Sequence, residues 1–129
     1  MSTLLKIQSS LFNSHGQSST LATRFAEEWL AQNPEGKVVS RDLAEEPVPH
    51  LSLDRFQAFT TAPDERTGAQ QQVADYSDGL IEEVQNADVI VLGVPMYNFN
   101  VPTMLQSYFD HIARAGITFR YTKNGPEGL

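Results

Sequence analysis

The stretch Asp88-Val89-Ile90-Val91-Leu92-Gly93-Val94-Pro95 decides the fold of this chain. Residues 89–94 are six consecutive apolar or glycine positions without polar alternation. Such a run is typical of a β-strand that is covered on both faces, as in parallel sheets with helices on either side. We therefore expect this strand to lie at the centre of a parallel sheet.

Two shorter strands and two helices are predicted before this strand. Residues 4–8 and 37–43 are short, largely apolar segments that favour strands. Residues 21–30 and 73–84 carry apolar side chains three and four positions apart, which makes one helical face each. Ser18 or Ser19 is placed to cap the first helix, and Asn33-Pro34-Glu35-Gly36 ends it.

The remaining segments complete the outline. Residues 52–59 are compatible with a short helix, and the proline-bearing stretch before them predicts a surface connection. Pro102 suits the first turn of a third long helix with a continuous apolar face, and Gly116 closes that helix. Residues 117–121 alternate weakly, and residues 123–129 favour a turn.

The order of elements is β-α-β-α-β-α, which predicts an α/β fold with a doubly wound parallel sheet in one domain, residues 1–129. Right-handed crossovers place the helices on both faces of such a sheet. Three strands are few for a sheet of this class. We therefore expect the domain to be incomplete in this chain.

Composition excludes several classes of function. The chain has 129 residues with 9 Lys and Arg against 16 Asp and Glu, a net charge of −7, and no basic stripe, so no nucleic-acid partner is expected. Cysteine is absent, as is common in a reducing compartment. The longest apolar run is far shorter than the roughly 20 residues that span a bilayer. We expect a cytoplasmic protein without a membrane partner.

In open α/β sheets, ligands bind beyond the carboxyl ends of the strands, and two loops qualify. Residues 9–19 follow the first strand, are rich in hydroxyl and amide side chains, and lead into a helix N-terminus, which favours an anion. The loop contains no Lys or Arg and neither the P-loop nor the dinucleotide glycine motif. A phosphate there would be held by neutral donors, and the alternative is a merely capped, solvated turn.

The second loop follows the predicted central strand and is more specific. It places Met96, Tyr97 and Phe99, all large and apolar or aromatic, where solvent exposure is unfavourable unless they cover a flat ligand or a partner. Asn98 adds a donor and an acceptor, the pair that reads the edge of a uracil-like ring such as an isoalloxazine. The alternative is that these side chains plug the top of the sheet.

Taken together, these features resemble the FMN-dependent NADH azoreductase family, which belongs with the flavodoxin-like quinone reductases. The resemblance rests on Ser9-Ser10 after the first strand, Gln17-Ser18 at the helix entry, Met96-Tyr97-Asn98-Phe99-Asn100 after the buried strand, and residues 113–121. It implies a flavodoxin-like sheet of order 2-1-3-4-5 and non-covalent FMN at the interface of a homodimer. It also implies reduction of quinones and azo bonds by NADH or NADPH, through ping-pong hydride transfer at flavin N5.

The resemblance assigns roles by position. We expect the FMN phosphate to be held by Ser10, Gly16, Gln17 and Ser18. We expect its ring to be lined by Met96, Tyr97, Asn98 and Phe99. The acceptor pocket is expected to be shaped by Phe119 and Tyr121. Gly16 stands where the family usually has serine, which removes one hydroxyl. The family also continues for roughly two more strands and helices, including a glycine-rich loop at the flavin. No protein side chain is expected to act as an acid, base or metal ligand.

Two other classes of function stay open at this point. An acidic flavodoxin-like carrier would bind FMN and exchange single electrons with a basic protein, without a small-molecule acceptor. A non-flavin α/β interaction domain would bind no FMN. The three histidines, His15, His50 and His111, lack the spacing of a helical metal site. His111 lies off the apolar stripe of its helix, which predicts an exposed or interfacial side chain.

Overall fold

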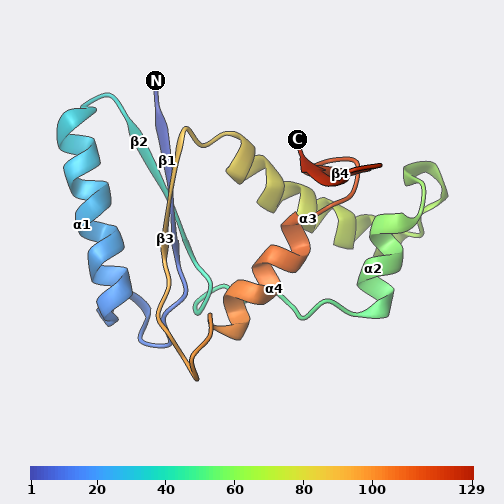
Figure 1. Ribbon diagram of the computed structural model, residues 1–129, viewed down its shortest axis with the longest axis horizontal. Coiled ribbons are helices and arrows are strands. Elements are labelled where there is room, and N and C mark those ends of the chain that lie inside the picture. Colours follow the sequence, from blue (N-terminus) through green and yellow to red (C-terminus); the bar gives the residue numbers. More distant parts are fainter.

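A computed structural model describes the whole chain, residues 1–129. Its main elements lie in the predicted order and alternate strand with helix (Figure 1). They are β1 (Thr3–Gln8), α1 (Gln17–Gln32), β2 (Lys37–Asp42), α2 (Leu53–Thr60), α3 (Gly68–Gln85), β3 (Val89–Gly93), α4 (Thr103–Ile112), β4 (Phe119–Thr122) and β5 (Gly125–Gly128). Two 3-10 turns, η1 (Asn13–His15) and η2 (Pro63–Glu65), lie in the loops.

The three long strands form one parallel sheet of order β2-β1-β3. Leu5 in β1 pairs with Val39 in β2 on one side and with Ile90 in β3 on the other. Helix α1 covers one face of the sheet, and α3 and α4 lie on the opposite side (Figure 1). The predicted α/β class, the parallel pairing and the helices on both faces are confirmed.

Strand β1 is the buried centre of the fold, because both of its faces are covered. Leu5 and Ile7 belong to the main hydrophobic cluster, and Leu4, on the alternate face, is also fully buried. Lys6 shares the face of Leu4, where its ammonium donates to Thr23 Oγ1 on α1 at 3.2 Å. The rest of the cluster comes from beyond β2 and from the two helices opposite α1: Leu43, Val48, Leu80, Leu105 and Tyr108.

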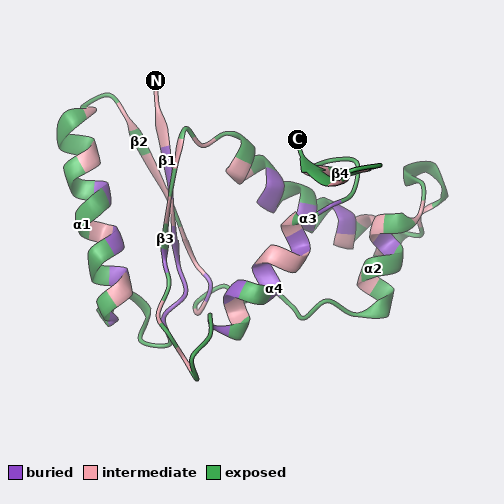
Figure 2. Ribbon diagram, viewed as in Figure 1, coloured by how far each residue is buried: buried purple, intermediate pink, exposed green.

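The predicted central position of the apolar strand β3 is wrong for this chain. β3 lies at one edge of the sheet, and its residues Ile90 and Leu92 are 44% and 42% exposed. By contrast, the buried positions of α1 lie on its side toward the sheet (Figure 2). The hydrophobic cluster takes residues from β1 but none from β3. A continuous apolar run therefore indicated the strand correctly but not its place in the sheet.

The helix boundaries differ from the sequence interpretation in three details. Gly16 caps α1 without a side-chain hydrogen bond, so the predicted capping by Ser18 or Ser19 is wrong; α1 begins one residue before Ser18. Pro102 is the N-cap of α4 rather than part of its first turn. Helix α4 ends at Ile112, and Gly116 serves the following turn with φ of 83°. The short helix α2 forms as expected.

The end of the chain forms an antiparallel hairpin, β4–β5, that is separate from the main sheet. Sequence patterning predicted a turn over part of this segment, and the weak alternation of residues 117–121 indicated the first strand only. Phe119 and Tyr121 project on the same face of β4, with their rings edge to face at 5.2 Å. No helix of the structure is both long and apolar enough to cross a membrane.

Candidate functional site at the carboxyl edge of the sheet

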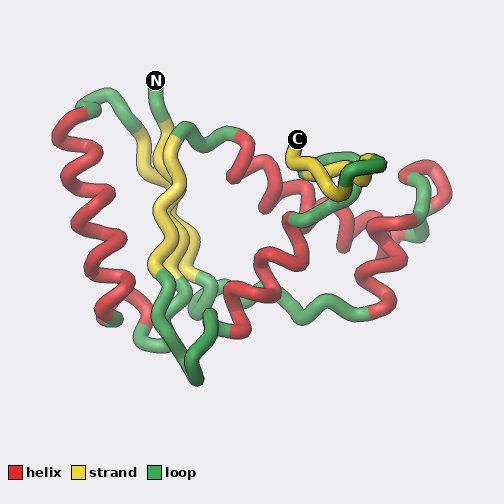
Figure 3. The backbone as a smooth tube through the Cα atoms, viewed as in Figure 1, coloured by secondary structure: helices red, strands yellow, loops and turns green.

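The two predicted ligand loops lie together at one end of the sheet. The chain leaves β1 and β3 at the same end, because the strands are parallel, and both loops lie beyond it (Figure 3). The hydroxyl of Ser9 donates to the carbonyl of Gly93 at 2.7 Å and joins the two strand ends. This edge of the sheet is therefore the place where both loops can contact one ligand.

The N-terminus of α1 offers unpaired donors to an anion. The N–H of Thr20 donates to the Gly16 carbonyl at 2.9 Å, so the N–H groups of the first turn, residues 17–19, have no intrahelical acceptor. Ser18 lies in this turn, and its hydroxyl is buried without a hydrogen-bond partner. A buried hydroxyl without a partner, beside the positive end of a helix, fits an anionic ligand such as a phosphate.

Gly16 makes room for the hydroxyl of Ser10. A Cβ atom at position 16 would lie 2.1 Å from Ser10 Oγ and 2.7 Å from Ser10 Cβ, both far inside van der Waals contact. The Ser10 oxygen accepts the N–H of Phe12 at 3.1 Å and so shapes the loop. Glycine at position 16 thus permits this close approach, and Ser10 lies at the entry to α1 as the sequence predicts.

The loop after β3 contains a tight turn of unusual backbone conformation. Tyr97 and Asn100 exchange two backbone hydrogen bonds of 3.0 Å, and the residues between them, Asn98 and Phe99, have φ of 52° and 64°. Two positive φ values in succession define a type I′ turn, which favours Asn and Gly and is strained for Phe by roughly 1–2 kcal/mol. Phe99 is nevertheless 93% exposed, and Met96 is 72% exposed. Strain and apolar exposure at one turn point to a functional surface.

Tyr97 turns toward the first loop. Its hydroxyl accepts the backbone N–H of Leu11 at 3.0 Å and lies 3.5 Å from Ser10 Oγ. Tyr97 therefore connects the two halves of the site, while Met96, Asn98 and Phe99 remain available to a ligand. The structure thus brings the phosphate-loop and ring-lining residues of the prediction to one edge.

Phe119 and Tyr121, the predicted acceptor-pocket residues, lie elsewhere. They line an open groove of about 590 Å³ that no residue of the two ligand loops enters. In Figure 1 the hairpin and the turn after β3 lie at different ends of the molecule. Within one chain, this groove is not part of the site at the sheet edge. Its lining comes from α2, α4 and the hairpin, with their flanking residues: Leu51, Phe56, Phe59, Thr60, Asp110, Ala113, Arg114, Ala115, Phe119 and Tyr121.

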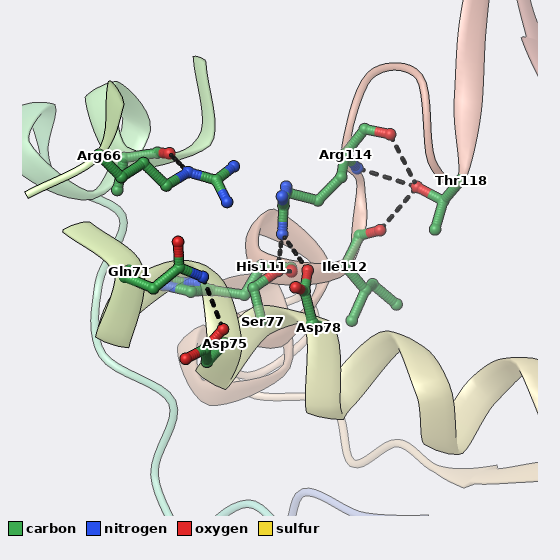
Figure 4. A network of polar contacts seen from close by, with 10 residues as sticks. Arg66, Gln71, Asp75, Ser77, Asp78, His111, Ile112, Arg114 and Thr118 are labelled. Carbon is green, nitrogen blue, oxygen red and sulfur yellow. Dashed lines mark hydrogen bonds and ion pairs between the residues drawn. The ribbon is translucent and has the colours of Figure 1, made fainter. Parts of the chain in front are cut away.

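A polar network at the base of this groove was missed by the sequence interpretation (Figure 4). Arg114 is 4% exposed, donates to Ser77 Oγ at 2.8 Å and Asp78 Oδ1 at 3.0 Å, and lies over the Phe59 ring at 4.5 Å. Ser77 in turn donates to the His111 carbonyl. Ser77 could have indicated this network from the sequence, because it is a serine on an otherwise apolar helix face and a buried hydroxyl requires a hydrogen-bond partner.

The expected exposure of His111 is wrong, because the side chain is fully buried in the same region. Its Nδ1 lies 2.9 Å from the Ser107 carbonyl, which only a protonated Nδ1 can satisfy, and its Nε2 accepts from Arg55 Nε at 2.8 Å. Burial lowers the pKa of His111, and Arg55 lowers it further against the effect of the Ser107 carbonyl. The contacts thus describe a neutral imidazole.

The site at the sheet edge offers hydroxyls, backbone N–H groups and the Asn98 amide as hydrogen-bond donors. Lys6 in β1 donates to Thr23 on α1. No group of three or more His, Asp or Glu side chains is placed to hold a metal ion. The arrangement can hold an anionic group at α1 and a flat ring at the turn after β3.

Comparison with known sequences gives a family match over nearly the whole chain. The model of a family described as having the flavodoxin-like fold matches residues 2–129. The FMN-dependent NADH:quinone oxidoreductase of Cellvibrio japonicus (strain Ueda107) is 59% identical over 129 residues, which is 100% of this chain and 65% of that protein. A protein of the same name from Marinomonas sp. (strain MWYL1) is 49% identical over 129 residues and is covered to 66%.

Solved structures show the same similarity. The azoreductase from Bacillus anthracis str. Sterne superimposes with a TM-score of 0.89 at 28% identity, over 100% of this chain and 64% of that one. An FMN-dependent NADH-azoreductase from Bacillus anthracis str. Ames Ancestor, solved in complex with FMN, gives a TM-score of 0.87 at 25% identity, over 100% and 63%. The chain thus spans about two thirds of the length of the proteins it matches.

Proposed function

Since residues 2–129 match its model, the chain belongs to the family with the flavodoxin-like fold, and from this premise we propose that it binds FMN as part of an NADH-dependent quinone reductase. One observation carries the proposal. The unpaired Ser18 hydroxyl at the N-terminus of α1 and the exposed, strained turn at Phe99 lie at the same edge of the sheet. An anion site beside a flat apolar surface matches the phosphate and the ring of FMN.

The residues at α1 fit the FMN phosphate. The N–H groups of Gln17 and Ser18 and the Ser18 hydroxyl would donate to its oxygens, and Ser10 retains a proton that it can donate. Gly16 allows the close approach of Ser10 to the helix start. These donors are neutral, so the dipole of α1 supplies the positive potential that an acidic chain does not provide with lysine or arginine.

The residues after β3 fit the ring system. Met96 and Phe99 present apolar surface to one side of the isoalloxazine, and the amide of Asn98 supplies a donor and an acceptor for the pyrimidine edge. The I′ turn fixes the backbone of Asn98 and Phe99, because the Tyr97–Asn100 pair closes it. This rigidity favours one orientation of the bound ring.

Bound FMN would supply the redox chemistry, accepting hydride at N5 from NADH or NADPH and passing it to a quinone or azo acceptor in ping-pong order. The protein residues contribute orientation and exclusion of water. Phe99 covers the ring beside the place where donor and acceptor bind in turn. No side chain at this edge is a general acid or base in the proposal.

We also propose that the assembly is a homodimer. Phe119 and Tyr121 lie in a groove away from the turn of their own chain, and Tyr121 is 76% exposed. Phe99, in the turn after β3, is 93% exposed. A second copy that set its groove against this turn would bury both apolar surfaces and would enclose the acceptor between Phe99 and the partner's hairpin.

Turnover of NADH tests the reductase activity. The FMN-loaded chain is mixed with NADH and a simple quinone, and the nicotinamide absorbance is followed with and without protein. We expect consumption of NADH in proportion to the quinone reduced. Bound FMN without turnover toward several quinones and azo dyes would contradict the reductase proposal.

One observation favours a second candidate, a flavodoxin-like electron carrier. The net charge of −7 suits docking to a basic redox partner. A carrier would bind FMN equally well but would leave NADH unoxidised in the presence of quinone. The exposed Phe99 turn favours the reductase, because a flat apolar surface beside the ring suits a small flat acceptor.

A further inference from the structure

We infer that Tyr97 is a positioning residue that couples the two halves of the flavin site, holding the phosphate loop in place through the backbone N–H of Leu11. This inference rests on the proposed binding of FMN. It assigns to Tyr97 a task at the phosphate end of the site, in addition to its place in the turn that faces the ring.

The contacts of the hydroxyl carry the inference. Tyr97 Oη accepts the Leu11 N–H at 3.0 Å and lies 3.5 Å from Ser10 Oγ, across more than 80 residues of sequence. Ser10 Oγ accepts the next N–H along the loop, that of Phe12, at 3.1 Å. Two hydroxyls in contact therefore satisfy two consecutive backbone donors.

The first loop has little else to hold it. Leu11 and Phe12 are 64% and 67% exposed, so no apolar packing fixes their positions. Ser9 anchors the start of the loop to the Gly93 carbonyl, but the other contacts of residues 11–15 are short-range hydrogen bonds within the loop, such as Asn13 N–H to the Ser10 carbonyl at 3.1 Å. Tyr97 provides the side-chain contact that ties residues 11–15 to the turn on the far side of the site.

The other end of Tyr97 is rigid. Its backbone N–H and carbonyl both bond Asn100 at 3.0 Å, which closes the strained turn through Asn98 and Phe99. A side chain anchored in such a turn can hold a flexible loop without moving itself. The loop so held leads directly into Gly16 and the first turn of α1, where the phosphate donors are.

Removal of the hydroxyl therefore affects the phosphate end selectively. Tyr97→Phe keeps the ring and loses the hydrogen bond to Leu11. We expect it to weaken FMN binding by roughly 2- to 10-fold, the range for one neutral hydrogen bond, and to leave the binding of riboflavin, which lacks the phosphate, unchanged. Tyr76→Phe is the matched control, because the Tyr76 hydroxyl lies on α3 away from both loops.

The experiment measures the affinities of FMN and riboflavin by quenching of flavin fluorescence for the wild-type chain and both variants. Hydrogen exchange of the Leu11 amide is measured without flavin, and we expect faster exchange in Tyr97→Phe alone. Equal losses for the two flavins, no loss for FMN, or unchanged Leu11 exchange would overturn the role of Tyr97. Failure of the wild-type chain to bind either flavin would instead overturn the proposed function.

Discussion

Replacement of Ser18 by alanine is predicted to separate ligand affinity from folding stability. The Ser18 hydroxyl is buried and has no partner in the protein, so its removal breaks no existing hydrogen bond. An unpaired buried hydroxyl is itself unfavourable. We therefore expect Ser18→Ala to leave the free energy of unfolding unchanged or to raise it by up to about 1 kcal/mol.

The effect on FMN has the opposite sign. In the proposed complex the hydroxyl donates to a charged phosphate oxygen, and a hydrogen bond to a charged group contributes roughly 1.5–3 kcal/mol. At about 1.4 kcal/mol per factor of ten, Ser18→Ala should weaken FMN binding roughly 10- to 150-fold. Riboflavin affinity should not change, because the isoalloxazine is held at the other loop.

Ser19→Ala is the matched control in the same helical turn. Ser19 is also fully buried with an unpaired hydroxyl, but it shares the helix face of Ala22 and Ala26 that packs on the sheet. Its removal should raise stability by a similar amount and leave FMN affinity unchanged. Urea denaturation and fluorescence titration measure the two quantities. Equal FMN affinity in Ser18→Ala and the wild-type chain would refute the assignment of Ser18.

Three further predictions concern the framework around the site. Gly16→Ala should destabilise the chain by roughly 1–3 kcal/mol, since the new Cβ overlaps Ser10; urea denaturation measures the loss. Ser77→Ala should cost about 2–4 kcal/mol, because it removes a bond to the Arg114 guanidinium and leaves the buried His111 carbonyl without its donor. The pKa of His111 is lowered in the folded state, so the unfolded chain binds more protons and stability should fall as the pH drops below about 6.5; His111→Gln should reduce this slope.

Each of these predictions has a contrary result. Ser40→Ala, at an exposed position of β2, is the control for Ser77→Ala and should change the free energy of unfolding by less than about 0.5 kcal/mol. An equally small change in Ser77→Ala would contradict the role of Ser77 in the Arg114 network. A Gly16→Ala variant as stable as the wild-type chain would show that Ser10 can move away. An identical pH slope in the wild-type chain and in His111→Gln, measured by urea midpoints between pH 7 and pH 5, would contradict the neutral buried imidazole.

The sequence predicts the elements well and their environment less well. The 3.6-residue spacing indicated α1 and α3, and the run at residues 89–94 indicated β3, because both patterns are formed by residues close together in the sequence. The position of β3 at an edge depends on which strands pair with it, and pairing joins segments far apart in the chain. The cap of α1 at Gly16 involves no side-chain hydrogen bond, so the search for a capping hydroxyl pointed to the serines after it instead.

The candidate site shows the same division. Ser18 and Phe99 were predicted as site residues because polar loops before helices and aromatic residues after strands are recognisable in the sequence, and the structure places both at the same edge of the sheet. The hydrogen bond from Leu11 to Tyr97 and the burial of Arg114 and His111 join segments far apart in the chain, and no spacing rule reveals them. The separation of Tyr121 from the turn after β3 likewise follows only from the three-dimensional path of the chain.

Binding of FMN relative to riboflavin by the wild-type chain tests the central claim most directly. We expect saturable 1:1 binding of FMN, with riboflavin bound at least about tenfold more weakly, because the phosphate makes several hydrogen bonds to neutral donors at the N-terminus of α1. Equal affinities would contradict the phosphate site, and no binding of either flavin would contradict the proposed function as a whole.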